Sequence, residues 1–123
     1  MKMEKKILAF DIGGTKIAAA IVGTDGSLRH IAQEPTCQEG PEAGFEQLAA
    51  MTEKCLQTAG MKKGDVSGIG IGIAAALETG TDRILWAPNI SGWQNVDLRA
   101  FLEERFGIPV CLEYDGHAAV LGE

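Results

Sequence analysis

Apolar and polar positions along the chain fall into blocks that predict short buried strands and two amphipathic helices. Ile7–Asp11, Lys16–Val22 and Leu28–Glu34 are the first three blocks. The glycine and Asp-Gly turns between these blocks are short enough to join antiparallel neighbours. The chain is therefore expected to begin with an antiparallel meander of three strands.

A helix and a fourth strand are expected after this meander. Thr36–Gly44 is interpreted as a polar loop, because it combines Pro41 with two glycines. The apolar stripe from Phe45 to Ala59 predicts a helix that ends at the glycine after it. Ser67–Ala76 then predicts a second buried strand, which is punctuated by glycines.

The next part of the chain is expected to be a loop followed by a helix and a strand. Thr79–Gly92 has the composition of a loop, with a short strand at Arg83–Trp86. Residues 94–97 are interpreted as the cap of a helix over residues 98–106, and residues 110–113 predict another main strand.

The resulting order of elements is β-β-β-α-β-α-β, and Gly116 opens one more helix. A meander followed by two right-handed helical crossovers predicts an α/β fold with a mixed sheet and helices on its faces. We expect residues 1–123 to form one domain.

Composition excludes several classes of protein. Of the 123 residues, 46% are apolar and 23% are charged, which is typical of a globular domain, and the formal net charge of -6 argues against nucleic acid as a partner. No stretch approaches a membrane span. The cysteines Cys37, Cys55 and Cys111 show neither a pairing pattern nor zinc-ligand spacing, which favours a reduced, cytoplasmic protein.

The segment Asp11–Lys16 carries the clearest chemical signal. Gly13 and Gly14 let the backbone turn tightly and bring N–H groups close to an anion, while Thr15 adds a hydroxyl donor and Lys16 a positive charge. Asp11 is suited to hold a hydrated divalent cation. A strand follows the glycines, where a Walker loop or a dinucleotide fingerprint would open a helix. The alternatives are an ordinary hairpin turn and the β-hairpin phosphate loop of the actin–hexokinase–Hsp70 ATPases, which have an RNase H-like fold.

Three segments together resemble the ROK family of repressors and bacterial sugar kinases. They are AFDIGGTKIAAAIV, APNISGWQNVDLRAFLEERFGIPV and LEYDGHAAVLGE, in the order of the family and spanning nearly the whole chain. The second and third segments are similar to the N-acetylmannosamine kinase branch. The resemblance implies a sugar kinase that uses ATP with Mg²⁺ and phosphorylates a hexose or N-acylhexosamine hydroxyl.

The resemblance also implies roles for individual residues. Asp115 would be the catalytic base and a sugar ligand, and Asn89 would bind sugar hydroxyls. Tyr114 and Ala75 would line the sugar site, and residues 11–16 would bind the phosphates of ATP, with Mg²⁺ held by Asp11 through water. Placing Asp115 after a strand agrees with this role, because ligands bind at the carboxyl ends of strands in open α/β sheets. The alternative for Asp115 is a helix N-cap.

The chain departs from the family on the sugar side. Tyr114 stands where the family has an asparagine, and residues 73–77 replace glycines or a Pro-Gly pair with a run that includes Ala75 and Ala76. His117 stands where the family often has an asparagine, and a structural role is the simpler reading of it. A catalytically degenerate sugar- or nucleotide-binding module is therefore one alternative function, and a sugar-sensing ROK regulator is another.

The family's kinases carry a second domain, with the adenosine pocket and a zinc site, and this chain lacks its motifs. The isolated chain is therefore expected to be inactive and to act within a full-length enzyme that forms a homo-oligomer such as a dimer. Sugar and ATP are the expected small-molecule partners. An ATPase from elsewhere in the superfamily is disfavoured by the Pro-Asn pair at Asn89 and the Tyr-Asp pair at Asp115.

Overall fold

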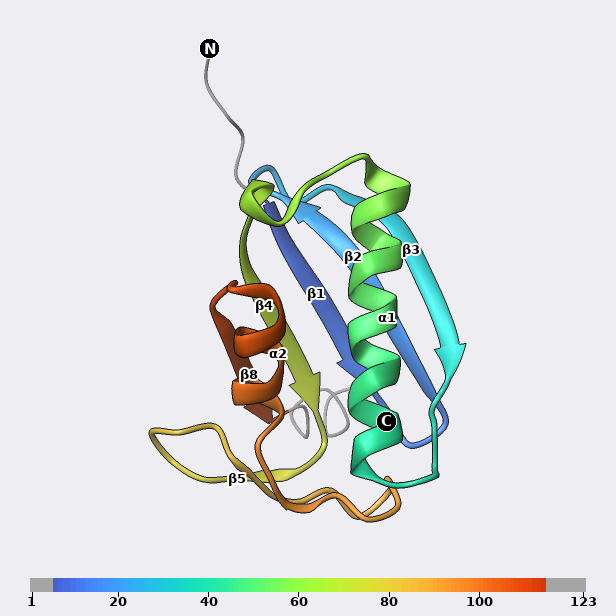
Figure 1. Ribbon diagram of the computed structural model, residues 1–123, viewed down its shortest axis with the longest axis vertical. Coiled ribbons are helices and arrows are strands. Elements are labelled where there is room, and N and C mark those ends of the chain that lie inside the picture. The colour runs from blue at the N-terminus through green and yellow to red at the C-terminus, as the bar shows by residue number, and fades with distance from the viewer. Residues whose placement is uncertain (1–5, 115–123) are drawn as a thin grey trace.

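A five-stranded mixed sheet forms the centre of the computed structural model, which describes residues 6–114 apart from the side chains of residues 30 and 31 (Figure 1). The first three strands are antiparallel neighbours, whereas β1 pairs with β4, and β4 with β8, in parallel. Across the sheet the strands are β3 (Leu28–Pro35), β2 (Lys16–Gly23), β1 (Lys6–Ile12), β4 (Val66–Ile73) and β8 (Val110–Tyr114). The predicted meander and the predicted order of the main elements are confirmed.

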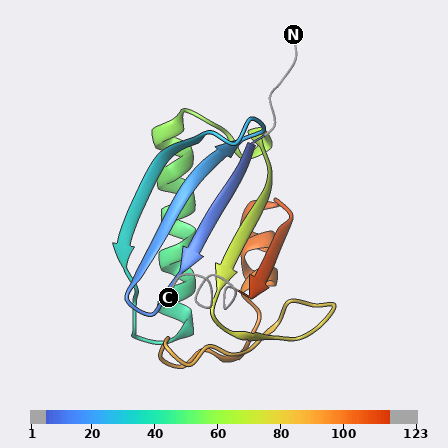
Figure 2. The same cartoon turned by 180° about the vertical axis from the view of Figure 1, so that it is seen from behind.

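Two α-helices lie in the connections between parallel strands. Helix α1 (Pro41–Ala59) lies between β3 and β4, and α2 (Leu98–Phe106) lies between β4 and β8. A short 3₁₀ turn at Lys63–Asp65 precedes β4. Both α-helices lie on the same face of the sheet, in front of it in Figure 1 and behind it in Figure 2. The chain moves in one direction from β3 to β4 to β8, so crossovers of the same hand place both helices on one side.

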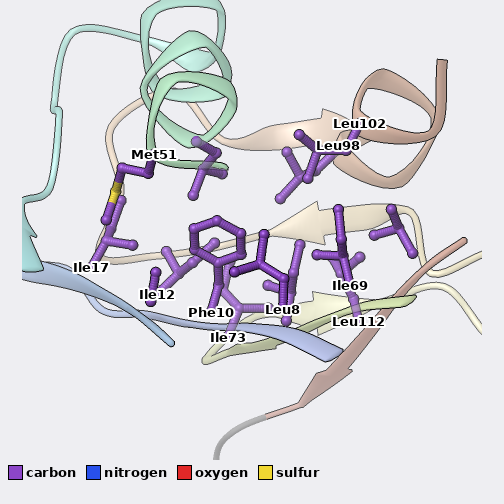
Figure 3. Packing of buried hydrophobic residues seen from close by; sticks show 14 of the residues in the cluster. Leu8, Phe10, Ile12, Ile17, Met51, Ile69, Ile73, Leu98, Leu102 and Leu112 are labelled. Carbon is purple, nitrogen blue, oxygen red and sulfur yellow. The ribbon is translucent and has the colours of Figure 1, made fainter. Parts of the chain in front are cut away.

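The hydrophobic core lies between these helices and the sheet (Figure 3). Alternate residues of β1, β2, β4 and β8 are buried in this core, as Leu8, Phe10 and Ile12 are from β1. Met51 reaches the core from α1 and Leu102 from α2, and both are fully buried. Burial of each large apolar side chain stabilises the fold by roughly 1.5–3 kcal/mol.

Helix α1 begins earlier than the sequence indicated. Residues up to Gly44 were expected to be loop, but Pro41 occupies the first helical turn, where a missing N–H is tolerated. Gly44 lies in this turn against the buried indole of Trp93, and a Cβ there would be 3.0 Å from Trp93 Cζ2. The predicted end of the helix at Gly60 is confirmed by the left-handed backbone of that residue, with φ 66°.

A second sheet of three short strands was largely missed. It contains β5 (Ala76–Leu77), β6 (Ile84–Trp86) and β7 (Gln94–Val96), of which only β6 was expected. The preceding strand β4 also ends at Ile73 rather than at Ala76. Of the residues assigned to the helix cap, only Asp97 performs that role, accepting a hydrogen bond from Ala100 N at 3.0 Å.

Tertiary contacts hold the β5–β6 hairpin against the edge of the main sheet. Asp82, in the turn between the two strands, has a left-handed backbone with φ 61°. Its Oδ2 accepts a hydrogen bond from Leu112 N of β8 at 3.0 Å and lies 3.7 Å from Arg99 Nη1. A local sequence pattern cannot reveal such contacts, which explains why the hairpin was interpreted as a loop.

No helix within residues 6–114 is long and apolar enough to cross a membrane. The three cysteines are free thiols: Cys37 is half-buried, Cys55 is buried and Cys111 is exposed. Burial raises the pKa of the Cys55 thiol above its usual value, as expected for a cysteine that packs in a core.

Candidate functional site

The carboxyl ends of three parallel strands meet at one edge of the sheet. Ile12 of β1 is in register with Ile73 of β4, which is in register with Tyr114 of β8. The arrowheads of these strands point to the same edge in Figure 2, next to the hairpin that contains β5. The loops that follow the three strands therefore begin side by side. Asp115, the predicted catalytic base, and His117 lie outside the described residues.

The glycine segment forms a tight hairpin between β1 and β2. Gly13 N donates a hydrogen bond to Lys16 O at 3.0 Å, and a Cβ on Gly13 would lie 3.2 Å from the same oxygen. Thr15 and Lys16 are exposed beside this turn. Asp11 is also exposed, on the face of β1 opposite to Phe10. The hairpin predicted from the two glycines is therefore present, with its polar side chains accessible.

Position 14 must be glycine because the loop that contains Asn89 packs closely against its backbone. A Cβ on Gly14 would lie 2.6 Å from Asn89 Cβ and 2.9 Å from Asn89 O, which is closer than real atoms pack. Asn89 is exposed, in a turn closed by a hydrogen bond from Ile90 N to Ala87 O at 3.2 Å. The structure thus brings together the two segments that were predicted to bind phosphate and sugar.

Residues that the sequence did not single out brace this junction. Thr36 Oγ1 donates to Gly13 O at 2.6 Å, and Thr36 N donates to Thr15 O at 2.9 Å. Gln38 Nε2 donates to Gly14 O at 2.8 Å and to Asn89 O at 3.1 Å. The only sequence signal for these residues was the polar character of the loop that contains them.

An apolar hollow of about 540 Å³ opens beside the ends of β4 and β8. Its lining includes two aromatic side chains, Trp86 and Tyr114, which are 53% and 64% exposed. Ala75 also lines it but is buried, whereas its neighbours Ala74 and Ala76 are exposed. The remaining lining residues are Leu77 and Pro88. Tyr114 and Ala75, two predicted sugar-site residues, therefore share one hollow.

Asn89 lies between the hollow and the glycine hairpin. Its chain neighbour Pro88 lines the hollow, and its own backbone packs on Gly14. A ligand in the hollow would therefore be a short distance from a phosphate held by the hairpin. This arrangement suits the transfer of a group between two bound molecules.

Residues 6–114 contain no cluster of three or more histidine, cysteine, aspartate or glutamate side chains able to hold a metal ion. Mg²⁺ needs no such cluster, because it keeps several waters and is often bound through one or two carboxylates and substrate phosphates. The exposed carboxylate of Asp11, close to the glycine hairpin, fits that kind of binding.

The mixed sheet, its covering helices and the loops at its carboxyl edge define a domain with the fold of the actin and hexokinase ATPases. The sequence profile of the ROK family matches residues 7–123. The chain therefore belongs to the ROK family, as its motifs indicated.

Similar proteins include both kinases and regulators. A glucokinase of Streptomyces coelicolor is 35% identical over 94% of this chain and 34% of its own length. A xylose repressor of Caldicellulosiruptor bescii is 34% identical over 69% of this chain and 21% of its own length. The crystal structure of a ROK family glucokinase from Streptomyces griseus in complex with glucose and AMPPNP is also similar. It has a TM-score of 0.80 and 33% identity, over 96% of this chain and 36% of that one. The chain thus spans about a third of the length of the kinases it matches.

Proposed function

We propose that residues 1–123 are the N-terminal domain of an ATP-dependent sugar kinase, which phosphorylates a hydroxyl of a hexose or an N-acylhexosamine. The observation that carries this proposal is the contact between the glycine hairpin and the loop of Asn89, next to the apolar hollow. A phosphate-binding turn and a sugar-binding loop must adjoin if phosphoryl transfer is to occur between their ligands.

On the phosphate side, the backbone N–H groups around Gly13 and Gly14 would bind phosphate oxygens of ATP, assisted by the Thr15 hydroxyl and the Lys16 ammonium. Asp11 would hold Mg²⁺ through water. The bound Mg²⁺ would neutralise part of the phosphate charge that develops during transfer. The exposure of Asp11, Thr15 and Lys16 is consistent with these roles.

On the sugar side, Asn89 would hydrogen-bond sugar hydroxyls, while Tyr114 and Ala75 would contact the sugar within the hollow. The aromatic ring of Tyr114 suits the apolar face of a pyranose and offers one hydroxyl for hydrogen bonding. Asp115 directly follows Tyr114 and would act as the base. Its carboxylate would accept the proton of the attacking sugar hydroxyl as the hydroxyl oxygen bonds to the γ-phosphorus of ATP. The bond between the γ-phosphorus and the β,γ-bridging oxygen would break at the same time, and ADP would leave.

Two functions other than a kinase are each favoured by a specific observation. The similarity to a xylose repressor favours a sugar-sensing regulator that would use the same hollow without transferring phosphate. The presence of Tyr114 and of Ala75 in the hollow, where the family pattern has an asparagine and a glycine or proline, favours a degenerate module that binds but does not turn over.

The cellular setting follows from the same proposal. We infer a cytoplasmic enzyme that forms a homodimer and whose partners are sugar and ATP, with neither nucleic acid nor membrane involved. A zinc site, where present, would belong to the second domain of the complete protein and not to these residues.

A sugar panel tests the proposal directly. The complete protein that carries this chain is incubated with ATP, Mg²⁺ and one sugar at a time, and ADP release is followed with a coupled assay. We expect release that depends on a hexose or an N-acylhexosamine. If no sugar stimulates ADP release but a sugar still binds by calorimetry, the regulator or the degenerate module replaces the kinase.

A further inference from the structure

The side chain of Gln38 joins the two loops of the candidate site. Its Nε2 donates to Gly14 O at 2.8 Å and to Asn89 O at 3.1 Å, and its Oε1 accepts from Ser91 N at 2.7 Å. One amide group therefore holds the glycine hairpin on one side and two positions of the Asn89 loop on the other. Gln38 belongs to neither loop, since it follows β3 and precedes α1.

The two hydrogen bonds donated by Gln38 have a particular electrostatic consequence. The carbonyl oxygens of Gly14 and Asn89 carry partial negative charge and would repel each other if they approached without a donor between them. The Nε2 group supplies both of its hydrogens in that position, which matches the donor capacity of an amide. The shared donor therefore offsets this repulsion at the place where Gly14 packs on Asn89.

We propose that Gln38 is a positioning residue that couples the glycine hairpin to the Asn89 loop, so that binding of the sugar and binding of the nucleotide strengthen each other. The proposal rests on the proposed function, because it assigns sugar to one loop and phosphate to the other. When a ligand fixes the conformation of one loop, the hydrogen bonds of the Gln38 amide also restrict the conformation of the other loop. Such coupling is reciprocal by thermodynamic necessity.

Three variants of the complete protein separate positioning from simple stability. Gln38→Met keeps the length of the side chain and removes all three hydrogen bonds. Gln38→Glu keeps the acceptor for Ser91 N but directs a carboxylate at two carbonyl oxygens. Gln57→Met is the matched control, because Gln57 is exposed near the far end of α1, about 24 Å along the helix from its first turn.

Four quantities are measured for each variant: kcat, the KM of each substrate, the factor by which a saturating sugar tightens nucleotide binding, and amide hydrogen exchange of residues 13–16 and 88–92. We expect Gln38→Met to reduce the tightening factor by about fivefold or more and to lower kcat more than either KM changes. Exchange should rise in both segments together. Gln38→Glu should be at least as damaging, and Gln57→Met should match the wild type.

Two contrary outcomes would overturn the proposal, and a third would overturn the proposed function alone. If the variants lose only thermal stability while kcat and the tightening factor persist, Gln38 is merely structural. If exchange rises in one segment and not in the other, Gln38 does not couple the loops. If the wild type transfers no phosphate to any sugar, the proposed function fails. In that case the paired rise in exchange, or its absence, still decides whether Gln38 couples the two loops.

Discussion

Gly14 packs its backbone directly on Asn89, so closely that a Cβ on the glycine would lie 2.6 Å from Asn89 Cβ. The φ angle of Gly14 is not in the left-handed region, so glycine is needed for space and not for backbone freedom. The contact links the turn between the first two strands to a loop that precedes the last helix of the described fold. It sets the separation between the two halves of the candidate site.

Gly14→Ala tests this contact. Because the obstructing atoms are a Cβ and backbone atoms rather than the end of a flexible side chain, one loop must move away from the other. We expect a loss of about 1–3 kcal/mol in the free energy of unfolding, and a fall in sugar-dependent ADP release that exceeds the loss of folded protein. Gly70→Ala is the matched control, since a Cβ there meets no atom within 4 Å. Equal activity in the two variants would contradict the role given to the contact.

Tyr114→Ala tests the sugar side of the site. The side chain of Tyr114 is 64% exposed, so its loss should leave the fold intact while removing one aromatic wall of the hollow. We expect the KM for the sugar to rise about 2- to 10-fold, which corresponds to the loss of one aromatic contact, with the KM for ATP unchanged. Tyr114→Phe should retain most of the affinity if the ring matters more than the hydroxyl. An equal rise in the KM of both substrates would count against a place for Tyr114 in the sugar site.

An ion pair between the two helices should make stability depend on acid pH. Arg105 Nη2 donates to Glu46 Oε2 at 2.8 Å and Nη1 donates to Oε1 at 3.3 Å, which holds the pKa of Glu46 below its usual value of 4.5. The carboxylate is favoured in the folded state, so this stabilisation is present above that usual pKa and is lost as the pH falls through the lowered one. Both side chains are exposed, so the effect is small.

Thermal unfolding of Glu46→Gln checks this dependence. Near neutral pH the variant should melt slightly below the wild type, and the difference should vanish at a pH well below 4.5. Glu104→Gln, at an exposed position of α2, is the matched control and should show no such convergence. A difference in melting temperature that persists unchanged into strong acid would show that the pair does not act through the Glu46 charge.

The main sheet could be predicted from the sequence because each of its strands has a local signal, a run of apolar residues bounded by turn residues. Ile7–Asp11 and Ser67–Ala76 are apolar runs closed by turns, and the structure places β1 and β4 there in parallel. The start of α1 was placed too late, because Gly40 and Gly44 were taken as loop residues although Pro41 and Glu42 are local signals of a helix start. That Gly44 is tolerated inside the helix depends on its fit against Trp93, a contact between segments that are far apart along the chain. The hairpin around Asp82 was missed because its hydrogen bond to β8 is a tertiary contact.

The residues of the candidate site also differ in whether a local sequence signal could reveal them. The Gly13-Gly14 hairpin was visible because a turn of two glycines between strands is a local signal. Gln38 was not visible, because its role depends on three partners in two other loops. Asn89 and Asp115 were assigned by resemblance to the family, and only Asn89 falls within the described residues.

The role of Asp115 as the base is the central claim, and turnover by Asp115→Asn in the complete protein tests it most directly. Sugar-dependent ADP release is measured at saturating substrates, and nucleotide binding is measured separately by calorimetry. Asp25→Asn serves as the matched control, because Asp25 lies in the exposed turn between β2 and β3. The account predicts that Asp115→Asn lowers kcat by about 100-fold or more and changes the nucleotide Kd by less than about twofold, while Asp25→Asn keeps the wild-type rate. A wild-type kcat for Asp115→Asn would contradict the account.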